Sequence, residues 1–449
     1  MHFYFLPFLV ICGLLLIAAI IRPVLIYQYP YFMAATFVAF IAPQLFGLYK
    51  VGWADSFVTA TALMSLLCVA CCWLGYLPKA HPAIIERLNV SLNPNRLLHG
   101  GIALIVVGFF FTSKMTGVTI DEEVGLMSGI GTIYLFFGGL VYPGFAICFY
   151  CALQHRNPIA WVAAAVAATV PLQAAIFYGR REPTVLFILS FAMSFYFLKG
   201  KTPHRWAIVA AIIGGMFIIP AIGQYRQLAK DDPLAAFKSI DFKEEFGEYF
   251  DEDAISEVKN ATVLIAVSQQ TGDYEWGAGY WNRIVFRFVP AQILGRDFKD
   301  SLMIGGVQRD PGEFVEANMG AALPTGSTVT GLGDAFMQFG YFGCLVFAGM
   351  AYMFKNLWTA ANHADGTGAQ ILYIQVMTTA MRSLTHQTLD FLPGLIYSGI
   401  FIGLVVFYAK ERRDWSHELE HERGIRGKAE IAKAESRNLP KEETGKAES

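Results

Sequence analysis

The sequence predicts an all-α polytopic membrane protein with about 11 transmembrane helices and one long periplasmic loop. Hydrophobic residues make up 55% of the 449 residues, charged residues only 16%, and the mean hydropathy is +0.44. A soluble chain of this length would carry more charge. Many apolar runs approach the roughly 20 residues that a membrane span needs. A single long polar segment, residues 223–328, interrupts them.

Eleven apolar segments are candidate spans, because each lies within or near a length of about 17–25 residues. In chain order they are residues 3–21, 31–49, 57–77, 97–112, 128–151, 158–178, 183–199, 206–222, 329–354, 370–388 and 391–409. The first segment has neither a basic flank nor a small-residue cleavage site. We therefore interpret it as a retained span and not as a signal peptide.

The orientation follows from the basic residues of the short loops. One set of loops contains twelve: Arg22, Lys79, Arg87, Arg96, Arg156, Lys199, Lys201, Arg205, Lys355, Lys410, Arg412 and Arg413. The opposite set contains only four: Lys50, Lys114, Arg180 and Arg181. Basic loops stay in the cytoplasm, so we expect a periplasmic N-terminus, a cytoplasmic C-terminus and a periplasmic long loop in a bacterial inner membrane.

The chain accordingly divides into four parts. Residues 1–222 hold the first eight spans, residues 223–328 the loop, residues 329–409 the last three spans, and residues 410–449 a charged cytoplasmic tail. The tail has ten Lys/Arg and ten Asp/Glu, which is typical of a charged helix or a disordered segment.

The long loop changes character along its length. Its acidic run, residues 243–253, is followed by two apolar and aromatic stretches, residues 261–267 and 280–294. Both stretches are too short to span a bilayer. We expect them to form surface-lying or re-entrant helices over the mouth of the bundle.

Metal binding is not indicated. All seven cysteines fall inside apolar spans, and the groups at 68/71/72 and 148/151 have no histidine or acidic companion. Such pairs lack the ligand spacing of a zinc site. We expect no metal, no cofactor and no disulfide framework.

Arg382, His386 and Asp390 form the first candidate site. A spacing of four residues would place all three on one face of a helix that rises toward the outer surface. An arginine within a span costs at least about 2.5 kcal/mol, so it should face a polar cavity. The alternative is a structural salt bridge with snorkelling near the helix end.

Arg180 and Arg181 form the second candidate site, at the outer junction of the sixth and seventh spans. Pro183 suits the first turn of the following helix, and Glu182 suits its positive end. Two arginines beside a helix N-terminus are also suited to bind phosphate. The alternative is an ordinary basic hairpin, although its position on the outer face runs against the charge trend.

Three arginines of the long loop form the third set. Arg226 emerges from the eighth span, and Arg283 and Arg287 share one face of the amphipathic stretch 281–289. The loop as a whole has ten Lys/Arg against seventeen Asp/Glu, so these arginines are not part of a generally basic surface. Attraction to acidic lipid remains an alternative role.

The last feature is the glycine-rich start of the ninth span, with the sequence LPTGSTVTGLGD at residues 323–334 and FGYFG at residues 339–343. Glycines there allow close helix packing or close approach of a ligand to backbone amides. Asp334 could serve simply as a partner of the helix dipole.

Taken together, the Gly-Arg-Arg segment at 179–181, the long external loop and the glycine-rich span resemble the Wzy-type O-antigen and exopolysaccharide polymerases. The resemblance extends over residues 176–404. Family members often carry Glu where Asp334 stands. The resemblance implies a metal-independent glycosyltransferase of the inner membrane that moves a growing glycan from one undecaprenyl diphosphate carrier onto a second lipid-linked repeat unit.

This chemistry gives the candidate residues roles. Arg180, Arg181, Arg226, Arg283 and Arg287 would bind the diphosphate by charge-assisted, often bidentate, hydrogen bonds. His386 would act as the general base or orient the acceptor hydroxyl, and Asp390 would position its imidazole. Arg382 would also bind the diphosphate. The expected partners are lipid-linked oligosaccharide repeat units, membrane lipids, and flippase and chain-length regulator proteins, but no nucleic acid.

Three other functions remain open. An O-antigen ligase has a similar architecture and the same donor but a different acceptor. A polyprenol-phosphate-sugar transferase should carry acidic residues in its first external loop, where this chain has only Asp55. A transporter should carry charges deep in several spans and often shows inverted repeats, whereas these charges cluster at one face and no repeat is visible.

Overall fold

The computed structural model describes residues 2–51, 55–115, 130–228, 233–239, 257–320, 322–324 and 328–411. The chain divides into two compact units, residues 1–409 and 410–449. Within the described residues every regular element is helical and there is no strand, so the predicted all-α class is confirmed. The predicted acidic run at 243–253 and the charged tail beyond Glu411 lie outside the described residues.

Nine helical segments of the described chain are long and apolar enough to cross a membrane, which confirms a multi-pass architecture. Five are single helices: α1 (His2–Ile21), α4 (Asp55–Leu74), α6 (Pro94–Lys114), α9 (Pro158–Ile176) and α10 (Arg181–Lys199). The other four are composite: α2 (Tyr29–Thr36) with the π-turn η2 (Phe37–Ile41) and α3 (Ala42–Val51); α7 (Ile130–Gly138) with α8 (Val141–His155); α19 (Thr330–Phe339) with η4 (Gly340–Gly343) and α20 (Cys344–Ala361); and η5 (Thr388–Asp390) with α22 (Phe391–Ala409).

Two further predicted spans are helices whose described residues are not both long and apolar enough to cross a membrane. In α11 (Arg205–Leu228), the described side chains form an apolar helix over Arg205–Phe217, which is shorter than a span. In α21 (Thr367–Thr385), glutamines and an arginine interrupt the apolar sequence. The predicted total of eleven spans therefore stays a prediction.

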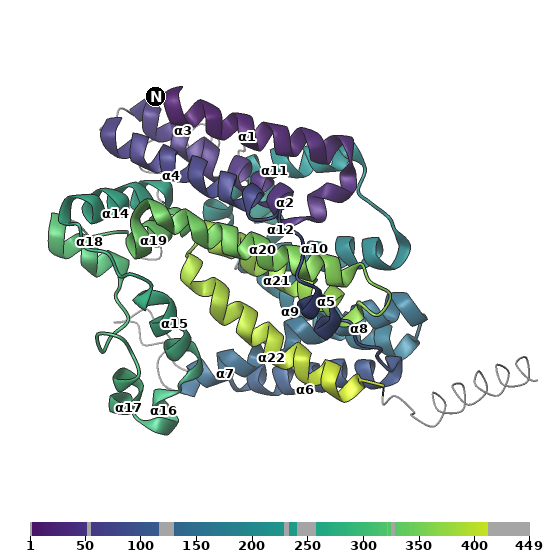
Figure 1. Ribbon diagram of the computed structural model, residues 1–449. Helices are drawn as coiled ribbons and strands as arrows, with labels where there is room; N and C mark the ends of the chain where they lie inside the picture. The colour runs from purple at the N-terminus through teal and green to yellow at the C-terminus, as the bar shows by residue number, and fades with distance from the viewer. Residues whose placement is uncertain are drawn as a thin grey trace, which may run out of the picture. The chain divides into compact units, whose positions relative to one another are not determined.

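The two largest hydrophobic cores of the described chain hold the bundle together. The first lies where α1 to α4 pack on α19, α20 and α21, and Figure 1 shows α20 and α21 running between the N-terminal helices and α22. Here the rings of Tyr29 and Phe354 stack with their centroids 4.8 Å apart. The second core joins α6, α8, α9 and α22. The C-terminal helices therefore contact both cores.

The long loop contributes six described helices: α12 (Pro233–Ser239), α14 (Glu257–Thr271), α15 (Ala278–Phe288), α16 (Ala291–Leu294), α17 (Arg296–Ser301) and α18 (Pro311–Met319). The first predicted apolar stretch is α14, which packs into the bundle against α4 and α19. Its Val258 and Ile265 are fully buried, so α14 does not lie on the surface. The second stretch forms α15, an amphipathic helix that exposes Trp281 and Phe286.

Glycines at the start of α19 allow it to pack closely on its neighbours. A Cβ atom at Gly331 would lie 2.0 Å from the Ser383 carbonyl oxygen of α21, and one at Gly333 would lie 2.9 Å from the Ala261 Cα of α14. Both obstacles are backbone atoms, which cannot rotate away. Close helix packing, one of the two predicted uses of these glycines, is therefore observed.

Gly331→Ala should destabilise the protein by about 1–3 kcal/mol, because overpacking forces the two helices apart. The matched control is Gly349→Ala in α20, where an added Cβ meets no atom within 4 Å. Thermal unfolding of both purified variants measures the difference. Equal melting temperatures for the two variants would contradict the close packing of α19 on α21.

Candidate functional site

The candidate residues gather at one end of the bundle. Helix α10 begins there with Arg181, and α21 ends there one turn after Arg382. The short turn η5 and the loop helix α15 meet at the same place, because α15 packs against both η5 and α22. Segments separated by more than 200 residues in sequence thereby contribute to one site.

Asp390 lies at the centre of this site between two arginines. Its Oδ1 accepts hydrogen bonds from Arg283 Nε at 2.8 Å and Nη2 at 2.6 Å. Its Oδ2 lies 3.0 Å from Arg382 Nη2. The Asp390 side chain is only 13% exposed, so solvent screens these contacts poorly. Each carboxylate oxygen of Asp390 therefore holds the guanidinium of a different arginine in a fixed position.

Arg382 also reaches a second carboxylate. Its Nη1 lies 3.3 Å from Glu182 Oε2, which links α21 to the start of α10. The Arg382 Nε atom is buried and has no hydrogen-bond partner among the described residues. The four side chains Glu182, Arg382, Asp390 and Arg283 form a continuous ionic chain across the site. The salt bridge that was the alternative role for Arg382 is thus observed, and its Nε has no acceptor among the described residues.

His386 does not share a helical face with Arg382 and Asp390. The span predicted over 370–388 ends as a helix at Thr385, and Gln387 is extended with φ −150° and ψ 138°. The Thr328 hydroxyl donates to the Thr385 carbonyl oxygen at 3.0 Å and so satisfies one acceptor of the helix end. The predicted single helical face is wrong, although Asp390 still returns to Arg382 through η5.

The His386 ring is half-buried beside this helix end. Its Nδ1 lies 2.9 Å from the Thr385 hydroxyl. Asp390 Oδ1 accepts from Arg283 and its Oδ2 lies beside Arg382, and the positioning of the imidazole by Asp390 stays a prediction. The role of His386 as a base stays a prediction.

Asp334 anchors the turn that carries Asp390. This carboxylate is 1% exposed, and its Oδ2 accepts hydrogen bonds from the Thr388 hydroxyl and from the Leu389 amide at 3.0 Å. The Thr388 hydroxyl also lies 2.7 Å from the Tyr280 hydroxyl of α15. Asp334 therefore fixes η5 rather than facing a substrate. Sequence reasoning missed this role, although an acidic residue within a span is costly enough to need a specific partner.

Arg180 and Arg181 are adjacent in sequence but point to different surroundings. Gly179 has φ 53°, which turns the chain before α10. Arg181 lies with its Nη1 3.5 Å from Glu257 Oε1 of α14 and its guanidinium over the Phe40 ring. Arg180 is exposed and forms no salt bridge within the described part of the chain. Of the two, Arg180 is the one with a guanidinium open to a ligand.

Arg287 lies on the bundle side of α15. Its guanidinium carbon is 5.8 Å from the Phe136 ring centroid and 5.9 Å from that of Tyr397, which are cation–π distances. Loss of water around the guanidinium, followed by the like charge of Arg382, lowers the pKa of Arg287. Like Arg180, it forms no salt bridge among the described residues. The side chain of the fifth predicted arginine, Arg226, lies outside the description.

The site as a whole therefore has an excess of positive charge. Its five described arginines are Arg180, Arg181, Arg283, Arg287 and Arg382, and the carboxylates paired with them are Glu182, Glu257 and Asp390. Arg180 and Arg287 remain without an ionic partner in the described chain. Within those same residues, no three His, Cys, Asp or Glu side chains are grouped so that they could hold a metal ion. This arrangement suits an anion with several oxygens.

No protein-family model matches this chain, and neither a curated protein nor a solved structure shows significant similarity to it.

Proposed function

We propose that this protein is a polysaccharide polymerase of the bacterial inner membrane. It would transfer a growing glycan from undecaprenyl diphosphate to a lipid-linked repeat unit on the periplasmic face, without a metal ion. The observation that carries the proposal is the arginine cluster at the end of a multi-pass bundle, where Arg180 and Arg287 lack ionic partners within the described residues.

The chemistry needs such a cluster. The leaving group is a lipid diphosphate, whose negative charge grows as the anomeric bond breaks. Guanidinium groups stabilise that charge through forked hydrogen bonds, and the sugar becomes oxocarbenium-like. Arg287 and Arg180 would take phosphate oxygens, while Arg382 would add its unpartnered Nε. The lipid tails would lie between the spans.

The location of the cluster is also appropriate. It lies at the end of α10 that begins with Arg181, opposite the basic loop with Lys199, Lys201 and Arg205. By the positive-inside rule, the cluster faces the periplasm. Lipid-linked repeat units are polymerised on that face.

Ser239→Cys should react with an impermeant maleimide in cells with a permeabilised outer membrane. Ser239 is exposed at the end of α12 in the long loop. Ala83→Cys, exposed in α5 (Pro82–Leu88) of the basic loop between α4 and α6, is the matched control for the opposite face and should react only after inner-membrane lysis. The background should be low, because six of the seven native cysteines are buried. The reverse labelling pattern would invert the orientation.

His386→Gln and His386→Ala should both lose polymer synthesis by about 10²–10⁴-fold, the usual contribution of a general base. Both variants should still bind the lipid-linked donor, because the arginines remain. Glutamine keeps a polar group near Thr385 but cannot accept the proton. Normal polymer from the glutamine variant would make His386 structural and leave Glu182 and the loop carboxylates as candidates for the base.

Deletion of the gene in its native host tests the function directly. A polymerase deletion should remove long glycans and leave single repeat units attached to undecaprenyl diphosphate and to their final acceptor. A ligase deletion would instead leave long glycans on the lipid carrier. A transporter deletion would leave repeat units on the cytoplasmic face. Mass spectrometry of the lipid-linked pool, with a protected sugar assay on sealed vesicles, separates the three outcomes.

A further inference from the structure

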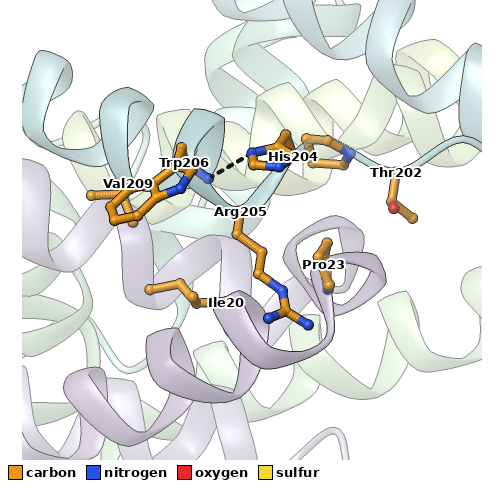
Figure 2. Close-up of a pocket in the computed structure, with 8 residues that line it drawn as sticks. Ile20, Pro23, Thr202, His204, Arg205, Trp206 and Val209 are labelled. Atoms are coloured by element: carbon orange, nitrogen blue, oxygen red, sulfur yellow. Dashed lines mark hydrogen bonds between the residues drawn. The ribbon is translucent and has the colours of Figure 1, made fainter.

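A surface pocket of about 700 Å³ lies at the opposite end of the bundle from the arginine cluster. Figure 2 shows it between the end of α1 and the start of α11. Its lining consists of Ile20, Pro23, Thr202, Pro203, His204, Arg205, Trp206 and Val209. Helix α10 has 19 residues and is about 28 Å long, and the pocket adjoins the loop that follows its far end. The pocket is therefore separate from the proposed catalytic site.

The polar wall of the pocket is positively charged. Arg205 Nη2 donates to the Ile21 carbonyl oxygen at 3.4 Å, and Figure 2 shows the guanidinium directed toward Ile20 and Pro23. Arg205 is exposed and forms no salt bridge within the described chain. No acidic residue lines the pocket, and the sequence has none at residues 1–54 or 183–230. An anion in the pocket would therefore meet no competing carboxylate from its lining.

The other wall of the pocket is apolar and continues along the bundle surface. Ile20 and Val209 line the pocket itself, and α11 packs beside α1. Exposed apolar side chains extend the surface along both helices: Ile17 is 56% exposed, Ile21 59%, Trp206 74% and Ile213 48%. A tryptophan at the end of a span is typical of the membrane interface. The positively charged wall of the pocket thus lies next to an exposed apolar surface.

We propose that this pocket binds the headgroup of an anionic phospholipid. The phosphate would accept hydrogen bonds from Arg205 and from the Thr202 hydroxyl, with His204 beside it, and the acyl chains would lie along α1 and α11. Basic pockets between spans on the cytoplasmic side bind such headgroups. A free phosphate ion would use the same cationic groups but would leave the apolar wall unused. This inference does not depend on the proposed polymerase activity.

The pocket has a structural consequence for the bundle. Arg205 already joins the start of α11 to the end of α1 through the Ile21 carbonyl oxygen. A bound phosphate would add a second link between these two helices. Lipid binding should therefore hold α11, whose opposite end enters the long loop, against the N-terminal core.

Native mass spectrometry of the full-length protein, released from nanodiscs with equal amounts of phosphatidylglycerol and phosphatidylethanolamine, tests the proposal. The wild-type protein should retain phosphatidylglycerol preferentially. Arg205→Gln should reduce the phosphatidylglycerol-bound fraction about tenfold, because a charge-assisted contact is lost. The matched control is Arg87→Gln, an exposed arginine in another basic loop that does not line the pocket; it should retain the lipid.

Val209→Phe provides a second variant, because it fills the pocket without removing charge and should also displace the lipid. Size-exclusion chromatography confirms that each variant is folded. Unchanged retention in both pocket variants would overturn the proposal, as would an equal loss in Arg87→Gln. Inorganic phosphate is the remaining probe. If it displaces phosphatidylglycerol at a concentration comparable to that of the lipid, the site binds a free anion and the lipid assignment is wrong.

Discussion

Arg382→Lys should lower polymer synthesis by about two orders of magnitude while the protein still inserts and folds. Two different nitrogens of this guanidinium contact two different carboxylates, Asp390 at 3.0 Å and Glu182 at 3.3 Å. An ammonium group is a point charge and cannot reach both while also presenting Nε to a phosphate. One lost charge-assisted hydrogen bond is worth about 1.5–3 kcal/mol, which corresponds to about 10–100-fold in rate.

The matched control is Arg309→Lys, because Arg309 forms a similar pair in the long loop, with Nη2 2.6 Å from Asp273 Oδ2. That pair is exposed to solvent, so its loss should change synthesis less than twofold.

Arg181→Lys should also impair synthesis, since Arg181 connects α10 to Glu257 of α14. Polymer length and amount, normalised to protein level, are the measurements. Wild-type polymer from both the Arg382 and Arg181 variants would reduce these residues to structural roles.

Asp390→Asn should destabilise the protein by about 3–5 kcal/mol, the usual cost of removing one partner from a buried ion pair. The asparagine has nearly the same shape, so packing is retained and only the charge is lost. Arg283 and Arg382 would then face each other without the carboxylate that now separates them. Thermal unfolding in detergent or nanodiscs measures the loss.

The double variant Arg283→Gln with Asp390→Asn should recover part of that stability, because it removes the charge of Arg283, whereas Arg382 keeps Glu182 as a partner. A double-mutant cycle isolates the coupling between the two side chains. Asp273→Asn is the surface control: its carboxylate is half exposed, and its loss should cost less than about 1 kcal/mol. Additive effects of the Arg283 and Asp390 changes would show that the pair contributes no coupling energy.

The fold class was predictable because the length and hydropathy of a membrane span are properties of consecutive residues. Segment boundaries such as the end of α21 were less predictable, since they depend on tertiary contacts. The helix ends at Thr385, where the hydroxyl of Thr328, 57 residues away, donates a hydrogen bond to the Thr385 carbonyl oxygen. Likewise, α14 is buried because it packs against α4 and α19. Its sequence alone does not distinguish a buried helix from a surface helix.

The site residues were predictable from the cost of placing charge in or near a membrane, which drew attention to Arg382, Asp390 and the pair at 180–181. Their partners were not. Arg283 meets Asp390 across 107 residues, and Asp334 meets Thr388 across 54. Local spacing contains no information on such contacts. The four-residue spacing grouped Arg382 with Asp390, which do meet, but the single helical face that it implied is wrong.

The contact between Arg283 and Asp390 has a further consequence for selectivity. Oδ1 of Asp390 occupies the fork of Arg283, where one oxygen of a phosphate would otherwise bind. An incoming anion must therefore compete with a carboxylate that the protein itself supplies and that Asp334 holds in place. A monovalent ion such as chloride gains too little from one arginine to displace it. A diphosphate, which engages several arginines at once, can do so, and the site would discriminate by the number of negative oxygens that its ligand offers.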